Sequence, residues 1–547
     1  MADQPLTLKQ KITKFFAYLL LISAISATLA YFVARFTFIA SAEYDLFSRV
    51  FSVLLFFAEV FIIFQGIGYV IEIVRVIVKY KEIKEAREEQ FVLHTQPFVA
   101  VLVPSYFEPI EVLHQTIISC YNMSYKNKQL YLLDDSRYEL PEYQAEKYHA
   151  YKEQLEALCA EYKINLFRRK WRGAKAGIIN DFVDFIEGKP KEGSQCIYNI
   201  LKDKRNKPKY MAVFDADQNP FVDFLEPLVA KMEAESDLAF IQTPQYYTNI
   251  LKNRVARASG MQQVIFYEYI CQGKGAKTAM VCCGTNVLYR IKAFVAIGGF
   301  DETSVTEDFA TSVIFHYNGW RTAYDSRVGA FGRGPEDLTQ YFKQQFRWSL
   351  GTLGLFRKLV IDFFKNPLAL SWGNWWEYFI SCSYYLYGGV YIILLLAPIC
   401  FILFNIPTYL ADAAVYGAIF IPYIIVTVLA FVWTIKKRGY GVKELFLGQY
   451  LICVTFPIYM KAGFFALIGK KSKFQVTQKG ATHILSLRYL WPQLTMCFIC
   501  LLGLVWGINR LIYEREPFTA IVLNNLWCLY NFIILSTTLY FNNARAR

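Results

Sequence analysis

Long apolar runs stand at both ends of the chain, and a region of mixed polarity separates them. A helix that crosses a bilayer needs about 20 mostly apolar residues. The runs of roughly that length or more extend from Phe15 to Ala40, Val50 to Val78, Trp375 to Phe404, Leu410 to Ile435, Tyr489 to Ile508 and Phe518 to Tyr540. The pattern therefore predicts six membrane-spanning helices, two before and four after the central region.

One further apolar run, from Leu445 to Ile468, is interrupted by Gln449, Pro457 and Lys461. Polar residues within an apolar helix of this kind favour a helix that lies at the membrane surface. We therefore expect an interfacial helix here and not a seventh span.

Ionisable side chains inside the spans are candidates for function, because a charge within the bilayer is costly. Glu59, Glu72 and Glu377 meet this description. For Glu72, helix–helix contact or an interfacial position is the favoured interpretation. A further hypothesis is that a tyrosine cluster lines a path for a polysaccharide. The cluster consists of Tyr384, Tyr385, Tyr387 and Tyr391.

Lys and Arg collect on one side of the predicted spans. They precede the first span between residues 9 and 14 and follow the second between residues 79 and 87, whereas the loops 41–45 and 405–412 contain neither. Because Lys and Arg accumulate on the cytoplasmic side, we expect a multi-pass protein of the plasma membrane with both termini and the central region in the cytoplasm. These basic collars also explain the net charge of +13, so nucleic acid is not an expected partner.

The composition agrees with a chain divided between lipid and water. Of the 547 residues, 55% are hydrophobic and only 19% are charged, against about 45–50% and about 25% in soluble proteins. A wholly soluble enzyme, a disordered chain and a collagen-like fibre are therefore excluded. The 12 cysteines show no zinc-type spacing in the central region,.

The central region, from about Glu89 to about Gly373, predicts an α/β domain. Short β-rich runs extend over 98–103, 129–133, 211–214 and 238–241, and helical stretches such as Tyr143 to Tyr162 separate them. Apolar strands that alternate with helices indicate an open, mostly parallel sheet. Ligands bind beyond the carboxyl ends of the strands in such sheets.

Acidic residues follow two of these strands. Asp134 and Asp135 come after the second run, and Asp215 and Asp217 come after the run at 211–214. A D-x-D at a strand end presents carboxylates to a divalent ion that also holds a diphosphate, although such acids also form turns. Lys175 lies in a segment of small residues and adds a cation that suits phosphate,.

The order of the motifs resembles that of the processive family-two glycosyltransferases, which include cellulose, chitin and hyaluronan synthases. The motifs are Asp135, the D-x-D of Asp215 and Asp217, Thr306-Glu307-Asp308, and the Q-x-x-R-W of Gln344 to Trp348. The pattern is most similar to bacterial cellulose synthase catalytic subunits, because the segment 474–479 resembles the F-x-V-T-x-K gating loop of that subfamily. So many ordered motifs do not coincide by chance, although any one of them could.

The resemblance implies an α/β GT-A (Rossmann-like) cytosolic domain inserted in an α-helical transmembrane channel domain. The expected divisions are an N-terminal transmembrane hairpin at 1–88, the glycosyltransferase domain at 89–373 and a C-terminal channel region at 374–547. The channel region would include the interfacial helix and a gating loop at 470–485.

The resemblance also implies roles for single residues. Asp308 resembles the general base, in a triplet with Thr306 and Glu307, and Asp217 together with Asp215 would hold Mg²⁺ or Mn²⁺. Trp348 and Cys283 would contact the acceptor sugar. The implied nucleotide-sugar-binding residues are Pro104, Tyr106, Asp134, Asp135, Lys175, Asp215, Gln344 and Arg347, and the implied gating-loop residues are Phe474, Val476, Thr477 and Lys479.

The chain departs from the family pattern at three places. The K-A-G-N-x-N motif appears as Lys175 to Asn180 with Ile178 in place of the first asparagine. Val281-Cys282 replaces the usual aromatic pair near the acceptor pocket, which leaves the linkage of the product open. The sequence stops at Arg547, so a C-terminal cyclic-di-GMP-binding module, and control by that nucleotide, are not expected.

The leading hypothesis is a processive inverting β-glucan synthase. It would polymerise glucose from UDP-glucose through 1,4 or mixed 1,3/1,4 links and move the growing glucan chain across the lipid bilayer. A hyaluronan- or chitin-type synthase that uses a UDP-N-acetylhexosamine is the alternative within the fold, and a polysaccharide export channel without catalysis is the alternative from another class. Whether a periplasmic or cell-wall partner subunit takes part stays open.

Overall fold

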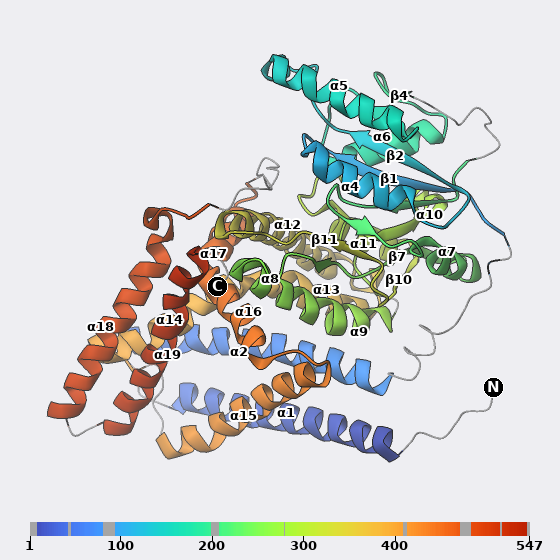
Figure 1. Cartoon of the computed structure of the whole chain (residues 1–547). Helices are drawn as coiled ribbons and strands as arrows, with labels where there is room; N and C mark the ends of the chain where they lie inside the picture. Colours follow the sequence, from blue (N-terminus) through green and yellow to red (C-terminus); the bar gives the residue numbers. More distant parts are fainter. Residues whose placement is uncertain are drawn as a thin grey trace.

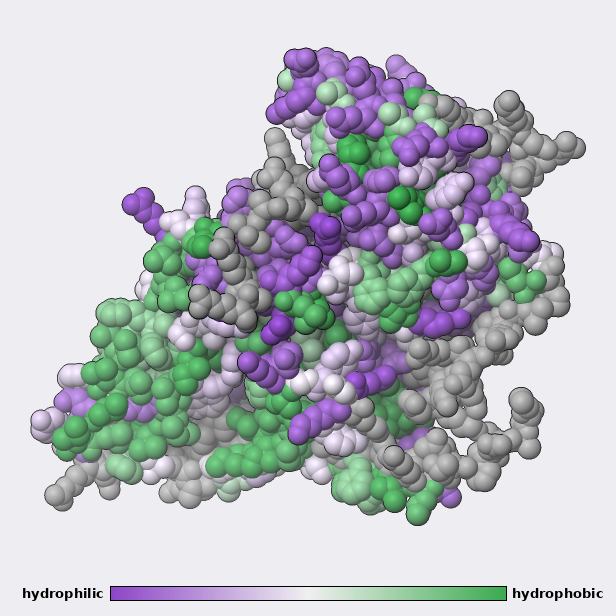
Figure 2. All heavy atoms as spheres, in the orientation of Figure 1, coloured by the Kyte–Doolittle hydropathy of each residue, from purple (hydrophilic) through white to green (hydrophobic). Residues whose placement is uncertain are grey.

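The protein is described by a computed structural model that covers residues 8–41, 45–79, 93, 95–197, 207–277, 279–407, 413–470, 483–514 and 517–543. Figure 1 shows two regions, an α/β domain and a set of long helices that lies along one side of it. In Figure 2, hydrophobic residues gather at the lower left over α18 (Trp491–Tyr513), and hydrophilic residues cover most of the α/β domain at the top. The apolar excess of the sequence is therefore concentrated in the helical region.

An eight-stranded sheet forms the centre of the α/β domain, in the order β10-β7-β9-β5-β1-β2-β3-β4. Strands β1, β2, β3 and β5 are parallel neighbours, whereas β9 pairs antiparallel with both β5 and β7. The sheet is therefore mixed. The strands are Val99–Ser105 (β1), Lys128–Asp134 (β2), Asn165–Arg168 (β3), Gln195–Ile197 (β4), Tyr210–Val213 (β5), Leu238–Gln242 (β7), Val287–Arg290 (β9) and Arg321–Tyr324 (β10).

The four strands predicted from the sequence correspond to β1, β2, β5 and β7. The side chains of β1 show why its apolar run is continuous. Val99, Val101 and Val103 belong to the core on one face of the sheet, and Ala100 and Leu102 to the core on the other. Because successive side chains in a strand point to opposite faces, a strand covered on both faces is apolar throughout.

Helices cover both faces of the sheet. Residues of α4 (Ile110–Tyr121), α5 (Glu146–Glu161) and α7 (Leu225–Ala234) contribute to one core. Residues of α6 (Lys175–Ile186), α10 (Ile291–Ala296) and α11 (Glu307–Tyr317) contribute to the other. The helix predicted over 143–162 is α5, preceded by the short 3-10 helix η1 (Pro141–Tyr143). A second sheet consists of β6 (Asn219–Pro220), β11 (Ala330–Gly332) and β8 (Tyr246–Tyr247).

Five helical segments among the described residues are long and apolar enough to cross a membrane. They are Ile22–Ala40 within α1 (Leu8–Ser41), Leu46–Val78 (α2), Trp372–Phe404, Leu487–Tyr513 and Phe518–Asn542 (α19). The third comprises α13 (Trp372–Ser383), the 3-10 turn η4 (Tyr384–Leu386) and α14 (Tyr387–Phe404), and the fourth comprises η5 (Leu487–Leu490) and α18. The chain is thus a multi-pass membrane protein.

Two predicted segments differ from a simple span or surface helix. The run predicted at 410–435 corresponds to α15 (Ala413–Lys437), in which the apolar part Ile421–Trp433 is shorter than the five spans. The run at 445–468 forms two helices, α16 (Val442–Val454) and α17 (Phe456–Leu467), which bend by 48° and would be a sixth span if counted as one. Pro457 at the start of α17 explains the break, because proline has no N–H for the preceding helical turn,.

Four elements connect the two regions. They are α8 (Arg254–Ile265), the π-helical turn η2 (Phe266–Cys271), α9 (Gln272–Gly275) and α12 (Leu338–Lys365), which is followed by the 3-10 helix η3 (Pro367–Ala369). Helix α8 packs on α16, α9 packs on α2, and α12 packs on α17. The carboxyl ends of the central strands therefore face a wall of membrane helices.

Candidate active site

A cavity of about 850 Å³ lies where the α/β domain meets the membrane helices. Its walls come from the ends of β1, β2 and β5, from α12, and from α2, α13, α16 and α17. The cavity thus brings together residues that are far apart in the sequence. The predicted site residues that line it are Pro104, Tyr106, Asp135, Lys175, Asp215, Asp217, Cys283, Thr306, Glu307, Asp308, Gln344, Arg347 and Trp348.

Asp134 is the predicted binding residue that does not line the cavity. Its carboxylate is buried and accepts hydrogen bonds from Arg168 Nε at 2.7 Å and from the backbone N of Ser136 at 3.1 Å. These contacts stabilise the turn after β2, so the structure places Asp134 in a supporting position. The neighbouring Asp135 does reach the cavity. The gating-loop residues Phe474, Val476, Thr477 and Lys479 lie outside the described residues.

Lys175 and Asp215 form an ion pair at the edge of the cavity. The Lys175 Nζ atom also donates to the carbonyl oxygen of Gly284 at 2.6 Å. Burial alone would lower the pKa of Lys175, but the carboxylates of Asp215, Glu307 and Asp308 raise it above its ordinary value. The side chain therefore stays cationic, as a group that contacts phosphate requires.

Asp308 stands in the first turn of α11, against the loop of Cys283 and Gly284. Gly284 has a φ of +82°, and a Cβ atom there would lie 2.5 Å from Asp308 Oδ2. A glycine is thus needed both for the backbone conformation and for the close approach of the carboxylate. Asp308 Oδ1 accepts a hydrogen bond from the backbone N of Phe309 at 2.8 Å, which fixes the orientation of the group.

The carboxyl groups of Glu307 and Asp308 are both difficult to ionise. Burial and the neighbouring Asp308 charge raise the pKa of Glu307 to about 7, although Lys175 and Arg347 oppose the shift. Burial also raises the pKa of Asp308, against the hydrogen bond from Phe309 and the same two cations. A carboxylate with a raised pKa is a stronger base than an ordinary one, as proton transfer from a hydroxyl requires.

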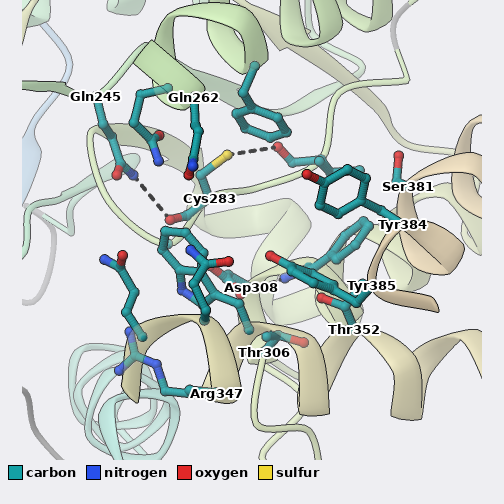
Figure 3. Close-up of a pocket in the computed structure, with 18 of the residues that line it drawn as sticks. Gln245, Gln262, Cys283, Thr306, Asp308, Arg347, Thr352, Ser381, Tyr384 and Tyr385 are labelled. Carbon is teal, nitrogen blue, oxygen red and sulfur yellow. Dashed lines mark hydrogen bonds between the residues drawn. The ribbon is translucent and has the colours of Figure 1, made fainter. Parts of the chain in front are cut away.

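Helix α12 carries the Q-x-x-R-W residues along one wall of the cavity. Gly351, one turn further along this helix, approaches Thr306 so closely that a Cβ would lie 2.6 Å from its Oγ1 atom. Figure 3 shows Asp308 between Cys283 on one side and Thr306 and Arg347 on the other, with Tyr384 and Tyr385 on the adjoining wall. Trp348 is half-buried and lines the cavity, so it is not a residue of the closed core.

Two side chains that hold the site were not predicted as functional. Gln242 accepts a hydrogen bond from the backbone N of Cys283 at 2.8 Å and donates to the carbonyl oxygen of Thr285 at 2.7 Å. Asn180 accepts from the backbone N of Phe300 at 2.8 Å. Gln242 thereby fixes the loop beside Asp308. Two signals in the sequence could have pointed to it: its place at the end of an apolar strand, and the segment Gln242-Thr243-Pro244, which fits the pattern of the family that the sequence resembles.

The membrane side of the cavity carries aromatic and amide side chains. Tyr384, Tyr385 and Tyr387 of the tyrosine cluster line it, whereas Tyr391 does not. Tyr459 of α17 also lines it and donates a hydrogen bond to Gln345 Oε1 at 3.0 Å. Further lining residues that sequence reasoning missed are Gln65, Trp376, Ser381 and Gln449. Aromatic faces next to hydrogen-bonding groups suit a carbohydrate, which has apolar faces and polar edges.

Four buried charges link the membrane helices to the α/β domain, and we call them the ion cluster. Arg75 of α2 binds Glu72 at 2.7 Å and Glu377 of α13 at 2.9 Å. Lys274 of α9 binds Glu377 at 3.0 Å. Two cations therefore neutralise two carboxylates between three elements, and Glu72, Lys274 and Glu377 also line the cavity.

The carboxylates of Asp215 and Asp217 are the candidates for a divalent cation. In the part of the chain that the structure describes, no group of three or more His, Cys, Asp or Glu side chains is arranged to hold a metal. Mg²⁺ is commonly held by one or two carboxylates and completed by substrate phosphates and water. Two oxygen-bearing side chains beside Lys175 fit that mode of binding.

Family models match two overlapping parts of the chain. The model described as glycosyl transferase family group 2 matches residues 210–540, and the model described as glycosyl transferase family 2 matches residues 100–298. The second match covers β1 to β9 of the sheet. The GT-A fold implied by the sequence resemblance is thereby confirmed.

Curated relatives are similar over most of this chain. The cellulose synthase catalytic subunit (UDP-forming) of Pseudomonas fluorescens (strain SBW25) is 26% identical over 80% of this chain and 56% of its own length. Cellulose synthase 2 of Novacetimonas hansenii is 26% identical over 80% of this chain and 26% of its own length. The chain thus spans between a quarter and a little over half of these relatives.

Among solved structures, the mannosyltransferase PcManGT from Pyrobaculum calidifontis, in complex with GDP-Man and Mn²⁺, is also similar. It is 14% identical, with a TM-score of 0.42 over 75% of this chain and 100% of that chain.

Proposed function

The chain belongs to glycosyl transferase family group 2, and from this premise we propose that it is a processive inverting β-glucan synthase of the plasma membrane. It takes glucose from UDP-glucose, adds it to a growing glucan through 1,4 or mixed 1,3/1,4 links, and passes the polymer across the bilayer. The α/β domain and both termini lie in the cytoplasm, on the side of the basic collars.

The observation that carries the proposal is the extent of the cavity between the α/β domain and the membrane helices. It contains the carboxylates of Asp215, Asp217 and Asp308 together with the tyrosines of the membrane helices. A transferase that releases a short product into water needs the carboxylates but not the tyrosines of the membrane helices. An export channel needs only the tyrosines, and it has no use for the buried carboxylate of Asp308 with its raised pKa.

In the proposed reaction, Asp308 removes the proton from the acceptor hydroxyl. The hydroxyl oxygen forms a bond to the anomeric carbon of the donor, and the bond from that carbon to the diphosphate oxygen breaks. Lys175 and Arg347 stabilise the negative charge that develops on the leaving UDP. Asp215 and Asp217 would hold Mg²⁺ or Mn²⁺, which supplies further positive charge to the diphosphate when bound. Trp348 and Cys283 orient the acceptor sugar.

The test is incubation of the purified full chain with Mg²⁺ and each radiolabelled UDP-sugar in turn. UDP-glucose should give a polymer that an endo-glucanase digests, and linkage analysis separates 1,4 from mixed 1,3/1,4 products. Polymer from a UDP-N-acetylhexosamine would replace this proposal with a chitin- or hyaluronan-type synthase. Absence of UDP release from every donor, with the purified chain and after addition of a periplasmic or cell-wall partner subunit, would favour an export channel.

A further inference from the structure

The guanidinium of Arg137 lies between two aromatic rings at one end of the cavity. Its central carbon is 4.6 Å from the ring centre of Tyr106 and 4.2 Å from that of Trp171. One hydrogen bond holds the Tyr106 side chain, and another holds the backbone at Trp171. Tyr106 Oη is 2.7 Å from Tyr143 Oη, and the backbone N of Trp171 donates to Glu139 at 2.7 Å. The two ring contacts therefore restrict the position of the guanidinium.

The side chain of Arg137 has no hydrogen-bond partner among the described residues. A guanidinium has five N–H donors, all in its plane. In the part of the chain that the structure describes, no hydrogen bond or ion pair to the Arg137 side chain is formed, and its Nε atom is buried without a partner. The neighbouring Arg168 and Arg169 both bind carboxylates. The terminal N–H donors of Arg137 are therefore left for a ligand in the cavity, which this side chain lines.

Asp135 presents acceptors at the same end of the cavity. Its Oδ1 atom accepts a hydrogen bond from Arg169 at 2.9 Å, and no other side-chain hydrogen bond reaches this carboxylate among the described residues. Asp135, Arg137 and Tyr106 all line the cavity. A donor and an acceptor thus line the same cavity, two residues apart on the turn after β2.

We propose that Arg137 reads the base of the donor nucleotide, donating to a ring carbonyl while Asp135 accepts from the adjacent ring N–H. This inference rests on the proposed function, because it assigns a residue to the nucleotide site of that reaction. Uracil presents such a pair at O4 and N3–H, and guanine presents one at O6 and N1–H. Cytosine and adenine present an amino group and a bare ring nitrogen instead, so both contacts are mismatched for them.

The arrangement explains why an arginine is needed and not a lysine. Lys has a compact, strongly hydrated charge, whereas the planar guanidinium stacks on aromatic rings and keeps its donors in a fixed geometry. Trp171 and Tyr106 are positioning residues in this scheme, because they hold Arg137 in the plane of the base edge.

Calorimetric binding of UDP, GDP, CDP and ADP to the purified full chain tests the inference without any transfer reaction. The wild-type protein should bind UDP more tightly than CDP. Arg137→Gln should weaken UDP binding about tenfold, the effect of losing one well-placed base contact, and should bring the UDP and CDP affinities close together. Trp171→Leu retains Arg137 but removes one of its two ring contacts. This variant should therefore also reduce the ratio of the UDP affinity to the CDP affinity. Arg254→Lys is the matched control, because Arg254 lies 4.2 Å over the ring of Tyr540, outside the cavity.

The outcomes separate this inference from the function on which it rests. Unchanged UDP affinity and an unchanged UDP-to-CDP ratio in a folded Arg137→Gln variant would overturn the role of Arg137 and leave the UDP-glucose synthase intact. Binding of GDP but not UDP, lost in Arg137→Gln, would support the role of Arg137 and overturn UDP-glucose as the donor. Binding of CDP as tight as that of UDP to the wild-type protein would also overturn the inference. A thermal-unfolding measurement on each variant excludes misfolding as the cause of lost binding.

Discussion

At the scale of single residues, Asp308 is the group on which the proposed chemistry depends. Asp308→Asn keeps the size and the hydrogen bond from Phe309 but removes the ability to accept a proton. We expect sugar transfer to fall by about 10²–10⁴-fold, the usual contribution of a general base, while UDP binding changes little. Radiolabel incorporation and calorimetry measure the two effects.

Asp237→Asn is the matched control for this variant, because Asp237 pairs with Arg321 on the surface, away from the cavity. It should leave transfer and binding unchanged. Loss of UDP binding together with transfer in Asp308→Asn would contradict the base assignment and indicate that Asp308 holds the fold of the site.

The raised pKa values of Glu307 and Asp308 predict how transfer depends on pH. A base works only when ionised, so kcat/KM should rise with pH and level off above the pKa of the pair, which burial raises to about 7 for Glu307. Glu307→Gln removes a neighbouring negative charge and should move the acid limb to lower pH. The interaction between Glu307 and Asp308 would be contradicted by an acid limb of the kcat/KM profile near the ordinary pKa of a carboxyl. An acid limb that Glu307→Gln does not move would contradict it as well.

The sequence led to most of these residues because each ends an apolar strand or belongs to an ordered motif. It did not distinguish Asp134 from Asp135, since adjacent residues share every pattern that a sequence offers. Both carboxylates bind a buried arginine, and only the position of Asp135 at the cavity distinguishes it from Asp134. Arg137 was missed for a similar reason, because its two ring contacts come from segments 31 and 34 residues away on either side.

At the scale of elements, the close contact between α12 and the turn before α11 positions the Thr306–Asp308 segment. Gly351→Ala would place a Cβ 2.6 Å from the Thr306 side chain and 2.8 Å from its backbone N. Because a displacement of about 1 Å in an active site costs about 10²-fold in rate, we expect a loss of transfer of that order with the protein still folded.

Gly354 supplies the control on the same helix. A Cβ at Gly354 would meet nothing within 4 Å, and alanine favours a helix over glycine by about 1 kcal/mol. Gly354→Ala should therefore keep full activity and a slightly higher unfolding temperature. Equal activity of Gly351→Ala and Gly354→Ala would show that the contact with Thr306 does not position the site.

Elements with a continuous apolar pattern were predictable, and short or irregular ones were not. Strands β1, β2, β5 and β7 carry uninterrupted apolar runs. Strand β9 (Val287–Arg290) follows a glycine-containing loop and has only three apolar residues before Arg290, too short a run to predict a strand. The π-helical turn η2 has no local sequence signature, because its geometry arises where α8 and α9 pack between the domain and the membrane helices.

At the scale of the whole molecule, the cavity exists only because the two regions are joined in one orientation. The ion cluster spans this junction, and its members are separated by about 200 residues between Glu72 and Lys274 and by about 100 between Lys274 and Glu377. The sequence marked Glu72 and Glu377 as unusual within spans but gave no partner for them. Such pairings depend on the packing of α2, α9 and α13, which no local pattern specifies.

Charge balance in the ion cluster leads to a prediction about the stability of the junction. Lys274→Met leaves one cation against two carboxylates, and Glu377→Gln leaves two cations against one. Each single variant buries an uncompensated charge, which costs about 3 kcal/mol, and should lower the midpoint of thermal unfolding in detergent. The double variant is neutral again, so it should recover most of the loss. If the two losses simply add, the four charges are not coupled, and the orientation of the domain on the membrane helices must depend on apolar packing of α12 and α8 instead.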